Sequence, residues 1–296
     1  MRGALILGDL CLDIDVEQGE RRGSQIEARR IRLCPAGSGG NVAITMASLG
    51  LEAVIASPVS RDPVFSLLGS MLARLTGPRV VELWGSGGTC TIINVYRAGR
   101  PRRVLYHPGP RASLRGYVEA LELEASRLGH VHLTGYLLEL VPHAEIQELL
   151  DRGRGYSASI DLHPRAGLLG APLRSLLGRV DYVFGTLTEI ASLLGSIREA
   201  ADKLISSGVK CMVVKLGSRG ARAYCRDGTY SYKPQPVRPV MLKGAGDVFV
   251  ATFLASLAMR KSHEASLEEA VRESARHVAG QGPLNKAWDS IAGGVA

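Results

Sequence analysis

The sequence contains no run of apolar residues long enough to cross a membrane. A transmembrane helix needs about 18 or more consecutive apolar residues, and the 296-residue sequence contains no such run. The first residues, Met1 to Asp9, also lack the basic segment and the small-residue cleavage site of a secretory signal. We therefore expect a cytoplasmic protein without a membrane partner.

Cysteines are few, and none has the spacing of a metal site. The chain contains no CxxC pair, and its five cysteines are scattered, at Cys11, Cys34, Cys90, Cys211 and Cys225. The scatter argues against both a zinc site and a disulfide framework. We therefore expect five buried side chains that behave as small apolar residues.

No recognisable nucleic-acid-binding motif is present, although the formal net charge is +8 and the pI is about 9.4. Clustered Lys and Arg side chains would neutralise phosphates, but the arginines are spread along the chain, and their densest group lies within residues 21–32. The sequence favours a basic, solvated surface that also attracts anionic nucleotides. We expect no nucleic-acid partner.

Apolar runs typical of strands alternate with helical segments through most of the chain. Strands are expected at 4–7, 53–56, 131–134, 158–161, 182–184 and 212–216, and helices at 41–50, 143–151 and 197–207. The length and the 46% hydrophobic content allow a substantial core. The alternation predicts an α/β fold in three layers, with a mostly parallel central sheet covered by helices on both faces.

Two segments, 14–34 and 89–108, interrupt this alternation. Each has the pattern strand, turn, strand, and the second turns at residues 97–100. Together they predict a small antiparallel sheet outside the main layer, which would cover a site. Because the sequence has no internal repeat, low-complexity tract or long linker, we expect one domain over residues 1–296 with this sheet as its lid.

The segment KGAGDVFVATFL at 243–254 places two glycines before Asp247 at the start of an apolar helix. Unhindered backbone N–H groups and the positive end of the helix would converge there beside a carboxylate. Such a site can hold a transferring phosphoryl group while the carboxylate accepts a hydroxyl proton. The same residues also fit a tight turn in which Asp247 is an ordinary N-cap.

A second glycine cluster, AGSGGN at 36–41, leads into another helix and follows Asp9 and Asp13. A carboxylate and the Asn41 amide offer the acceptors and donors that a vicinal diol needs, and the glycines would let a sugar ring approach the backbone. A flexible loop with Asn41 as the helix cap fits the pattern as well.

A third cluster, VVKLGSRGA at 213–221, follows a strand and contains neither GxGxxG nor GxxxxGK[ST]. It therefore supports neither a Rossmann dinucleotide site nor a P-loop. Lys215 at the end of this strand fits either a phosphate contact or an ordinary surface side chain.

In their order along the chain, these segments resemble the ribokinase (PfkB) family of carbohydrate kinases, from about residue 4 to at least residue 257. The most specific regions are those around Gly39-Gly40-Asn41 and Gly244 to Asp247. The further matching pieces are GDLCLD (8–13), a T…GxxR hairpin (89–103), VHLTGYLL (131–138), DLHPR (161–165), TLTE (186–189) and VVKLGSRGA (213–221).

The resemblance implies a ribokinase-like fold and an ATP-dependent transfer of phosphate to a hydroxyl of a sugar or sugar-like substrate. It also implies a lid that closes over the sugar, and commonly a homodimer formed through the lid sheets. Asp247 would be the catalytic base, and Gly244, Ala245 and Gly246 would form the anion hole. The substrate-binding residues would be Asp13, Gly39, Gly40, Asn41 and Arg165.

The nucleotide and its Mg²⁺ would be held by a further set of residues. By the same resemblance, the nucleotide site would include Lys215, Gly217, Ser218, Gly220, Thr186 and Lys243. Glu189 would organise Mg²⁺ through water. A nucleoside kinase of the same family, and a catalytically silent relative that binds a nucleotide or a sugar, are the alternatives.

Three positions depart from the family pattern. Met241-Leu242-Lys243 replaces an Asp-Thr segment linked to activation by monovalent cations. We hypothesise that the Lys243 ammonium replaces the cation charge beside the anion hole, so K⁺ would not stimulate the reaction. Thr186 stands in place of the Asn of Asn-x-x-Glu, and Ala36 stands where glycine is common.

Overall fold

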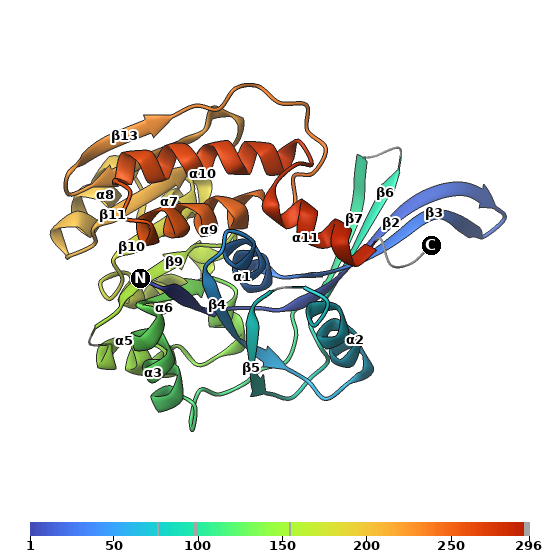
Figure 1. Ribbon diagram of the computed structural model, residues 1–296, viewed down its shortest axis with the longest axis horizontal. Coiled ribbons are helices and arrows are strands. Elements are labelled where there is room, and N and C mark those ends of the chain that lie inside the picture. The colour runs from blue at the N-terminus through green and yellow to red at the C-terminus, as the bar shows by residue number, and fades with distance from the viewer. Residues whose placement is uncertain (76, 98–99, 154, 293–296) are drawn as a thin grey trace.

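The computed structural model describes residues 1–75, 77–97, 100–153 and 155–292, and its centre is a sheet of nine strands (Figure 1). The strand order is β13-β12-β11-β10-β9-β8-β1-β4-β5. The pairs from β11 to β5 are parallel, and β12 and β13 join antiparallel at one edge. The strands are β1 (Gly3–Leu7), β4 (Glu52–Val59), β5 (Arg79–Trp84), β8 (His130–Thr134), β9 (Ser157–Asp161), β10 (Tyr182–Thr186), β11 (Cys211–Lys215), β12 (Ala221–Cys225) and β13 (Gly228–Tyr232).

Helices cover both faces of this sheet, which confirms the predicted three-layer α/β fold (Figure 1). One face packs against α3 (Val118–Leu128), α4 (Leu137–Leu140), α5 (His143–Arg152), α6 (Ala166–Leu177), α7 (Leu187–Leu194) and α8 (Ile197–Ser206). The other packs against α1 (Ser38–Ser48), α2 (Pro63–Leu72), α9 (Ala245–Ala258), α10 (His263–Val278) and α11 (Pro283–Ala292). No helix within the described residues is long and apolar enough to span a bilayer.

The apolar runs of the sequence are explained by this double cover. All five residues of β1 are buried, because a central parallel strand has helices on both sides. Helix α9 is buried at every position from Val248 to Ser256, since it lies between the sheet and α10. Its Phe253 meets Phe184 of β10 edge-on at 5.3 Å. The start of α9 is thereby fixed in place beside the strand ends.

A second sheet projects from the body as an arm, with strand order β3-β2-β6-β7 (Figure 1). Its strands are β2 (Cys11–Arg22), β3 (Gln25–Ala36), β6 (Thr91–Arg97) and β7 (Arg100–His107). The two hairpins are antiparallel, as predicted, and join through a parallel pair, β2 with β6. They match the predicted segments 14–34 and 89–108, although residues 98 and 99 of the predicted turn lie outside the described residues. That the whole chain is one domain stays a prediction.

Helix α1 begins three residues earlier than predicted, so Asn41 is not its cap. The chain turns at Gly37, whose φ of 89° favours glycine, and α1 starts at Ser38. The Asp9 carboxylate accepts hydrogen bonds from the backbone N–H groups of Ser38 (3.0 Å) and Gly39 (3.3 Å). The N-terminus of α1 is therefore capped by a residue 29 positions away, which leaves the Asn41 side chain free for another role.

The expectation of five unpaired cysteines was wrong, because two disulfides are present. Cys211 lies opposite Cys225 in the register of β11 and β12, and Cys11 at the start of β2 bonds to Cys90, which precedes β6. Each pair is brought together by strand pairing, which sequence spacing does not reveal. Cys34 is free and buried, as expected.

Counting reactive thiols tests these two bonds. When unfolded without reductant, the protein should present one thiol, Cys34, and after reduction it should present five. The Cys11–Cys90 bond has a sequence separation of 79, and loops of this size contribute about 2–5 kcal/mol to the free energy of unfolding. Urea unfolding of Cys11→Ser/Cys90→Ser should show that loss, whereas Cys34→Ser should not. Five thiols before reduction would contradict the assignment.

Candidate active site

The candidate site is a cavity of about 1270 Å³ at the carboxyl ends of the parallel strands. Residues at the ends of β9, β10 and β11 form part of its wall, together with the starts of α1 and α9 and residues of the lid strands β2, β6 and β7. Ligands of open α/β sheets commonly bind at this edge. The lid and the body therefore meet around one hollow.

The two most specific glycine-rich regions come together at this cavity. Asn41 Nδ2 donates a hydrogen bond of 2.7 Å to Asp247 Oδ2, although the two residues are 206 positions apart. Ser38 Oγ donates to the other carboxylate oxygen, Oδ1, at 2.8 Å. Asp247 is the third residue of α9, and the N-cap is Gly244. The alternative in which Asp247 caps its own helix is therefore wrong, since its side chain bonds to α1.

The environment of Asp247 raises its pKa to about 7. Burial is the largest cause, because a desolvated carboxylate is disfavoured, and the nearby Asp161 charge acts in the same direction. The hydrogen bonds from Asn41 and Ser38 and the charge of Lys215 oppose this rise. A carboxyl with a pKa near neutrality is suited to accept a proton at physiological pH.

The turn before Asp247 presents the N-terminus of α9 to the cavity. Gly244 has a φ of 80°, which favours glycine, and a Cβ at this position would lie 2.9 Å from Leu284 Cδ2, so that side chain would have to shift. The first N–H groups of a helix have no acceptor within the helix, and they form its positive end. Gly244, Ala245 and Gly246 all line the cavity. This geometry suits an anion.

A buried ion pair lies beside this helix end. Lys215 Nζ is 2.7 Å from both carboxylate oxygens of Asp161, across β10. It also lies 3.4 Å from the position that a Cβ on Gly246 would occupy. Burial lowers the pKa of Lys215, but the charges of Asp161 and Glu189 outweigh that effect and raise it. A protonated amine is therefore held next to the start of α9.

Thr186 and Glu189 form a capping box at the start of α7. Thr186 Oγ1 accepts from Glu189 N at 3.3 Å, and Glu189 Oε2 accepts from Thr186 N at 2.7 Å. Both residues line the cavity. Glu189 Oε1 makes no hydrogen bond to the described part of the chain. One carboxylate oxygen thus remains for a Mg²⁺-bound water, so this residue fits the predicted metal role.

The predicted acceptor residue Asp13 is almost completely buried at the base of the lid. Its Oδ1 accepts a hydrogen bond of 2.6 Å from Asn94 Nδ2, and its Oδ2 lies 2.6 Å from Lys243 Nζ. Lys243 Nζ also contacts both oxygens of Asp15, at 2.9 and 3.0 Å. The Lys243 ammonium is therefore bound to lid carboxylates on the acceptor side. Its predicted nucleotide contact and the cation-replacement hypothesis remain untested.

The other predicted residues fall into two groups. Gly217, Ser218 and Gly220 line the cavity, at and just after the 3₁₀ turn Gly217–Arg219. Gly39 and Gly40 lie in the first turn of α1 behind the cavity wall, where a Cβ on Gly39 would be 2.8 Å from Gly8 Cα. They bring the helix close to β1.

Arg165 does not lie where a substrate-binding residue was expected. It precedes α6, and its guanidinium donates to Glu139 Oε2 at 2.9 Å. The residues lining the cavity include His163 and Pro164 but not Arg165. The salt bridge directs this exposed side chain to Glu139 instead.

Sequence reasoning missed a wall of aromatic rings. Tyr136 lies between His163 and Tyr106, with ring centroids 4.8 and 6.2 Å away, and all three rings line the cavity. Tyr136 and His163 each lie two residues after the end of a predicted strand, and this position was the signal in the sequence that could have placed them at the site. The three rings add aromatic surface to a cavity that Asp9, Asp13 and Asp247 also line.

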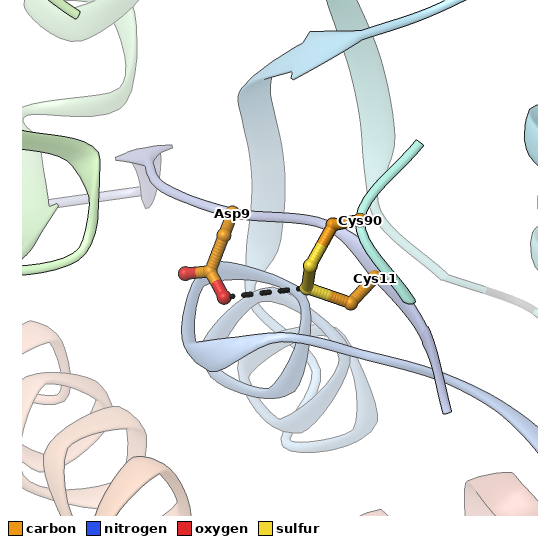
Figure 2. Close-up of side chains that lie close together, drawn as sticks. All are labelled: Asp9, Cys11 and Cys90. Atoms are coloured by element: carbon orange, nitrogen blue, oxygen red, sulfur yellow. Dashed lines mark hydrogen bonds between the residues drawn. A yellow bond between two sulfur atoms is a disulfide. The ribbon is translucent and has the colours of Figure 1, made fainter. Parts of the chain in front are cut away.

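Figure 2 shows the disulfide Cys11–Cys90 beside the carboxylate of Asp9. Cys11 Sγ lies 3.5 Å from Asp9 Oδ2, and Leu12 N donates to Cys90 O at 2.9 Å. The bond joins the beginnings of β2 and β6 where both strands leave the body. The two middle strands of the lid are thus covalently linked at its base.

Known proteins match this chain over almost its whole length. The model of the pfkB family carbohydrate kinases matches residues 1–288. A deoxyribokinase from Salmonella typhi is 25% identical, covering 90% of this chain and 88% of the relative, and a fructokinase from Klebsiella pneumoniae is 27% identical, covering 86% and 83%. The structure of an Arabidopsis thaliana ribokinase, described as complexed with ribose and ATP, superposes with a TM-score of 0.74 at 20% identity, covering 98% of each chain.

The fold and these matches place the protein among enzymes that phosphorylate small hydroxyl compounds. The chain belongs to the PfkB family of carbohydrate kinases, and its fold is the ribokinase-like α/β fold. The predicted family and enzyme class are confirmed.

The pKa of Asp247 predicts the pH dependence of turnover. If this group is the base, kcat/KM should fall about tenfold per pH unit below about 7 and level off above it, because only the carboxylate accepts a proton. Ser38→Ala removes a hydrogen bond that lowers this pKa, so its midpoint should move to higher pH. Ser48→Ala, at the other end of α1, is the matched control. An ADP-release assay from pH 5 to 9 measures kcat/KM for each variant. A Ser38→Ala profile with the wild-type midpoint would contradict the assignment of this pKa to Asp247.

Proposed function

We propose that the protein transfers the γ-phosphoryl group of ATP to a hydroxyl of a sugar or sugar-like acceptor in the cytoplasm. Asp247 is the base, and the amides of Gly244, Ala245 and Gly246 form the anion hole. The observation that carries the proposal is the 2.7 Å hydrogen bond between Asn41 and Asp247. It brings a polar acceptor region and a phosphate-binding helix end within one cavity.

The acceptor lies between Asp13, Asn41 and Asp247, with the first turn of α1, which contains Gly39 and Gly40, behind it. Asn41 Nδ2 is engaged by Asp247, but its Oδ1 is buried without a hydrogen-bond partner in the described residues. A buried amide oxygen without a partner is costly, so it is suited to accept from a substrate hydroxyl. Asp13 can accept from a second hydroxyl, which fits a vicinal diol.

The nucleotide lies on the other side of Asp247, along Lys215, Thr186, Gly217, Ser218 and Gly220. These residues line the same cavity at the ends of β10 and β11, and the related Arabidopsis ribokinase is described with ATP. Glu189 would hold Mg²⁺ through water, and the metal would supply charge neutralisation for the phosphates.

The reaction follows from the charges around Asp247. The ionised carboxylate takes the proton of the acceptor hydroxyl as the oxygen forms its bond to the γ-phosphorus, and the bond to the β-phosphate oxygen breaks. The helix amides and the Lys215 ammonium stabilise the negative charge on the phosphoryl oxygens. Asp161 keeps Lys215 protonated and in position.

A nucleoside is the second candidate acceptor, because the rings of Tyr106, Tyr136 and His163 line the site. Aromatic faces stack on bases as well as on the apolar faces of sugars. The relatives named deoxyribokinase and fructokinase favour a sugar.

The proposal includes a homodimer formed through the lids. The face of the lid opposite Asp13 and Asp15 exposes apolar side chains, with Ile31 62% and Leu105 57% accessible. Exposed apolar patches of this kind mark interaction surfaces. Pairing with the same face of a second lid would cover them.

Replacement of the base tests the proposed function. Over a panel of pentoses, hexoses, sugar acids and nucleosides, Asp247→Asn should lower kcat by roughly 10²- to 10⁴-fold while the melting temperature shows a folded protein. Asp227→Asn, which alters an exposed carboxylate bonded to His263, should retain wild-type turnover. Full activity of Asp247→Asn would refute the base, and binding without turnover by the wild type would identify a silent relative.

A further inference from the structure

Lys243 connects the lid to the body through its side chain. Its Nζ lies 2.6 Å from Asp13 Oδ2 and 2.9 Å from Asp15 Oδ1, so one ammonium joins two carboxylates of β2. The Lys243 side chain is only 21% exposed, and those of Asp13 and Asp15 are 1% and 15% exposed. Such desolvated ion pairs are screened far less than surface pairs.

The main chain of Lys243 is fixed to the body at the same time. Its carbonyl oxygen lies 2.6 Å from His277 Nε2, and since a carbonyl only accepts, this nitrogen carries the proton. The ammonium also lies 5.3 Å from the ring centroid of Trp288 in α11. The next residue is Gly244, the N-cap of α9. Lys243 thus reaches from the turn at Asp247 to the lid.

The two carboxylates depend on this ammonium. Asn94 Nδ2 donates to both Asp13 (2.6 Å) and Asp15 (2.9 Å), which places the two acids close together. Burial raises the pKa of Asp13, the charge of Lys243 opposes that rise, and the charge of Asp15 adds to it. Removing the cation would leave two like charges in a desolvated place, which is strongly unfavourable.

We propose that Lys243 is a positioning residue for the acceptor, whose ammonium ties Asp13 and Asp15 of the lid to the turn that leads into α9. This inference rests on the proposed function, in which Asp13 binds an acceptor hydroxyl. The tie holds Asp13 in place relative to Asp247, and Lys243 touches neither reacting oxygen. Loss of Lys243 should therefore weaken acceptor binding more than it slows phosphoryl transfer.

Steady-state kinetics separate these effects. With the panel sugar that the wild type turns over fastest, Lys243→Met should raise the acceptor KM by roughly 10- to 100-fold, with a smaller change in kcat and an unchanged KM for ATP. Lys261→Met removes a surface lysine paired with Glu269 and serves as the matched control. An unchanged acceptor KM would overturn the positioning role. A loss of activity that appeared only in kcat would overturn it as well.

A second variant tests whether Lys243 acts through the acid pair. Asp15→Asn removes the like charge beside Asp13 and keeps a side chain of the same shape. In the Lys243→Met background, this second substitution should lower the raised acceptor KM by at least threefold, because Asp13 no longer faces an uncompensated negative neighbour. Additive losses in the double variant would show that Lys243 does not act through these carboxylates.

Hydrogen exchange tests the tie without any substrate. Amide exchange in a peptide covering residues 11–17 should be faster in Lys243→Met than in the wild type or in Lys261→Met, since β2 loses its link to the body. Unchanged exchange would refute the tie even if the enzyme is active. Absence of turnover in the wild type over the whole panel would instead refute the proposed function and leave the exchange result to decide the tie.

Discussion

The hydrogen bond between Asn41 and Asp247 is the contact on which the site depends, because it joins the N-termini of α1 and α9 at one cavity. Two helix ends of the same polarity repel unless each is matched by negative charge. Asp9 accepts from the first N–H groups of α1 and so neutralises that end. Within the described residues, no side chain caps the start of α9, since Asp247 bonds across to α1. Of the two helix ends, that of α9 is therefore the one available to an anion.

The buried acids of the site differ in how they are compensated, and this difference sets their roles. Asp161 has Lys215, and Asp13 and Asp15 share Lys243. Asp247 bonds only to neutral groups, Ser38 and Asn41, in the described part of the chain. Its pKa consequently rises to about 7 by burial. Asp9 also bonds only to neutral groups, but two of these are the first N–H groups of α1, so its carboxylate serves as the cap of that helix. Asp247 instead combines neutral donors with a position in the first turn of α9, which suits the proposed role of base.

Local patterns predicted the layers of this fold but not the contacts between distant segments. Continuous apolar runs such as Ala4 to Leu7 predicted central strands, since burial on both faces leaves no polar alternation. The glycine-rich segments in their order predicted the family. The capping of α1 by Asp9 and the bond between Cys211 and Cys225 depend on tertiary placement and strand register. Neither contact can be predicted from the spacing of the residues in the sequence.

The partner of Lys243 was unpredictable for a related reason. Next to Gly244 in sequence, its ammonium was expected beside the anion hole, but a lysine side chain is long enough to reach a different wall of the cavity. The lid strand β2 offers two carboxylates there, whereas Lys215 already supplies a cation beside Gly246. A second ammonium at the same helix end would meet like charge, so electrostatics favour its position on the lid.

The base of the lid is held at successive points along β2. The disulfide at Cys11 links it to β6, and Lys243 holds Asp13 and Asp15 two and four residues further on. Beyond Gly19 the hairpin is exposed from Glu20 to Ile31. A hinge at the strand starts would break the two ion pairs between Lys243 and β2, whereas bending of the outer hairpins would leave them intact. The disulfide lies within the lid and would keep β2 and β6 together in either movement.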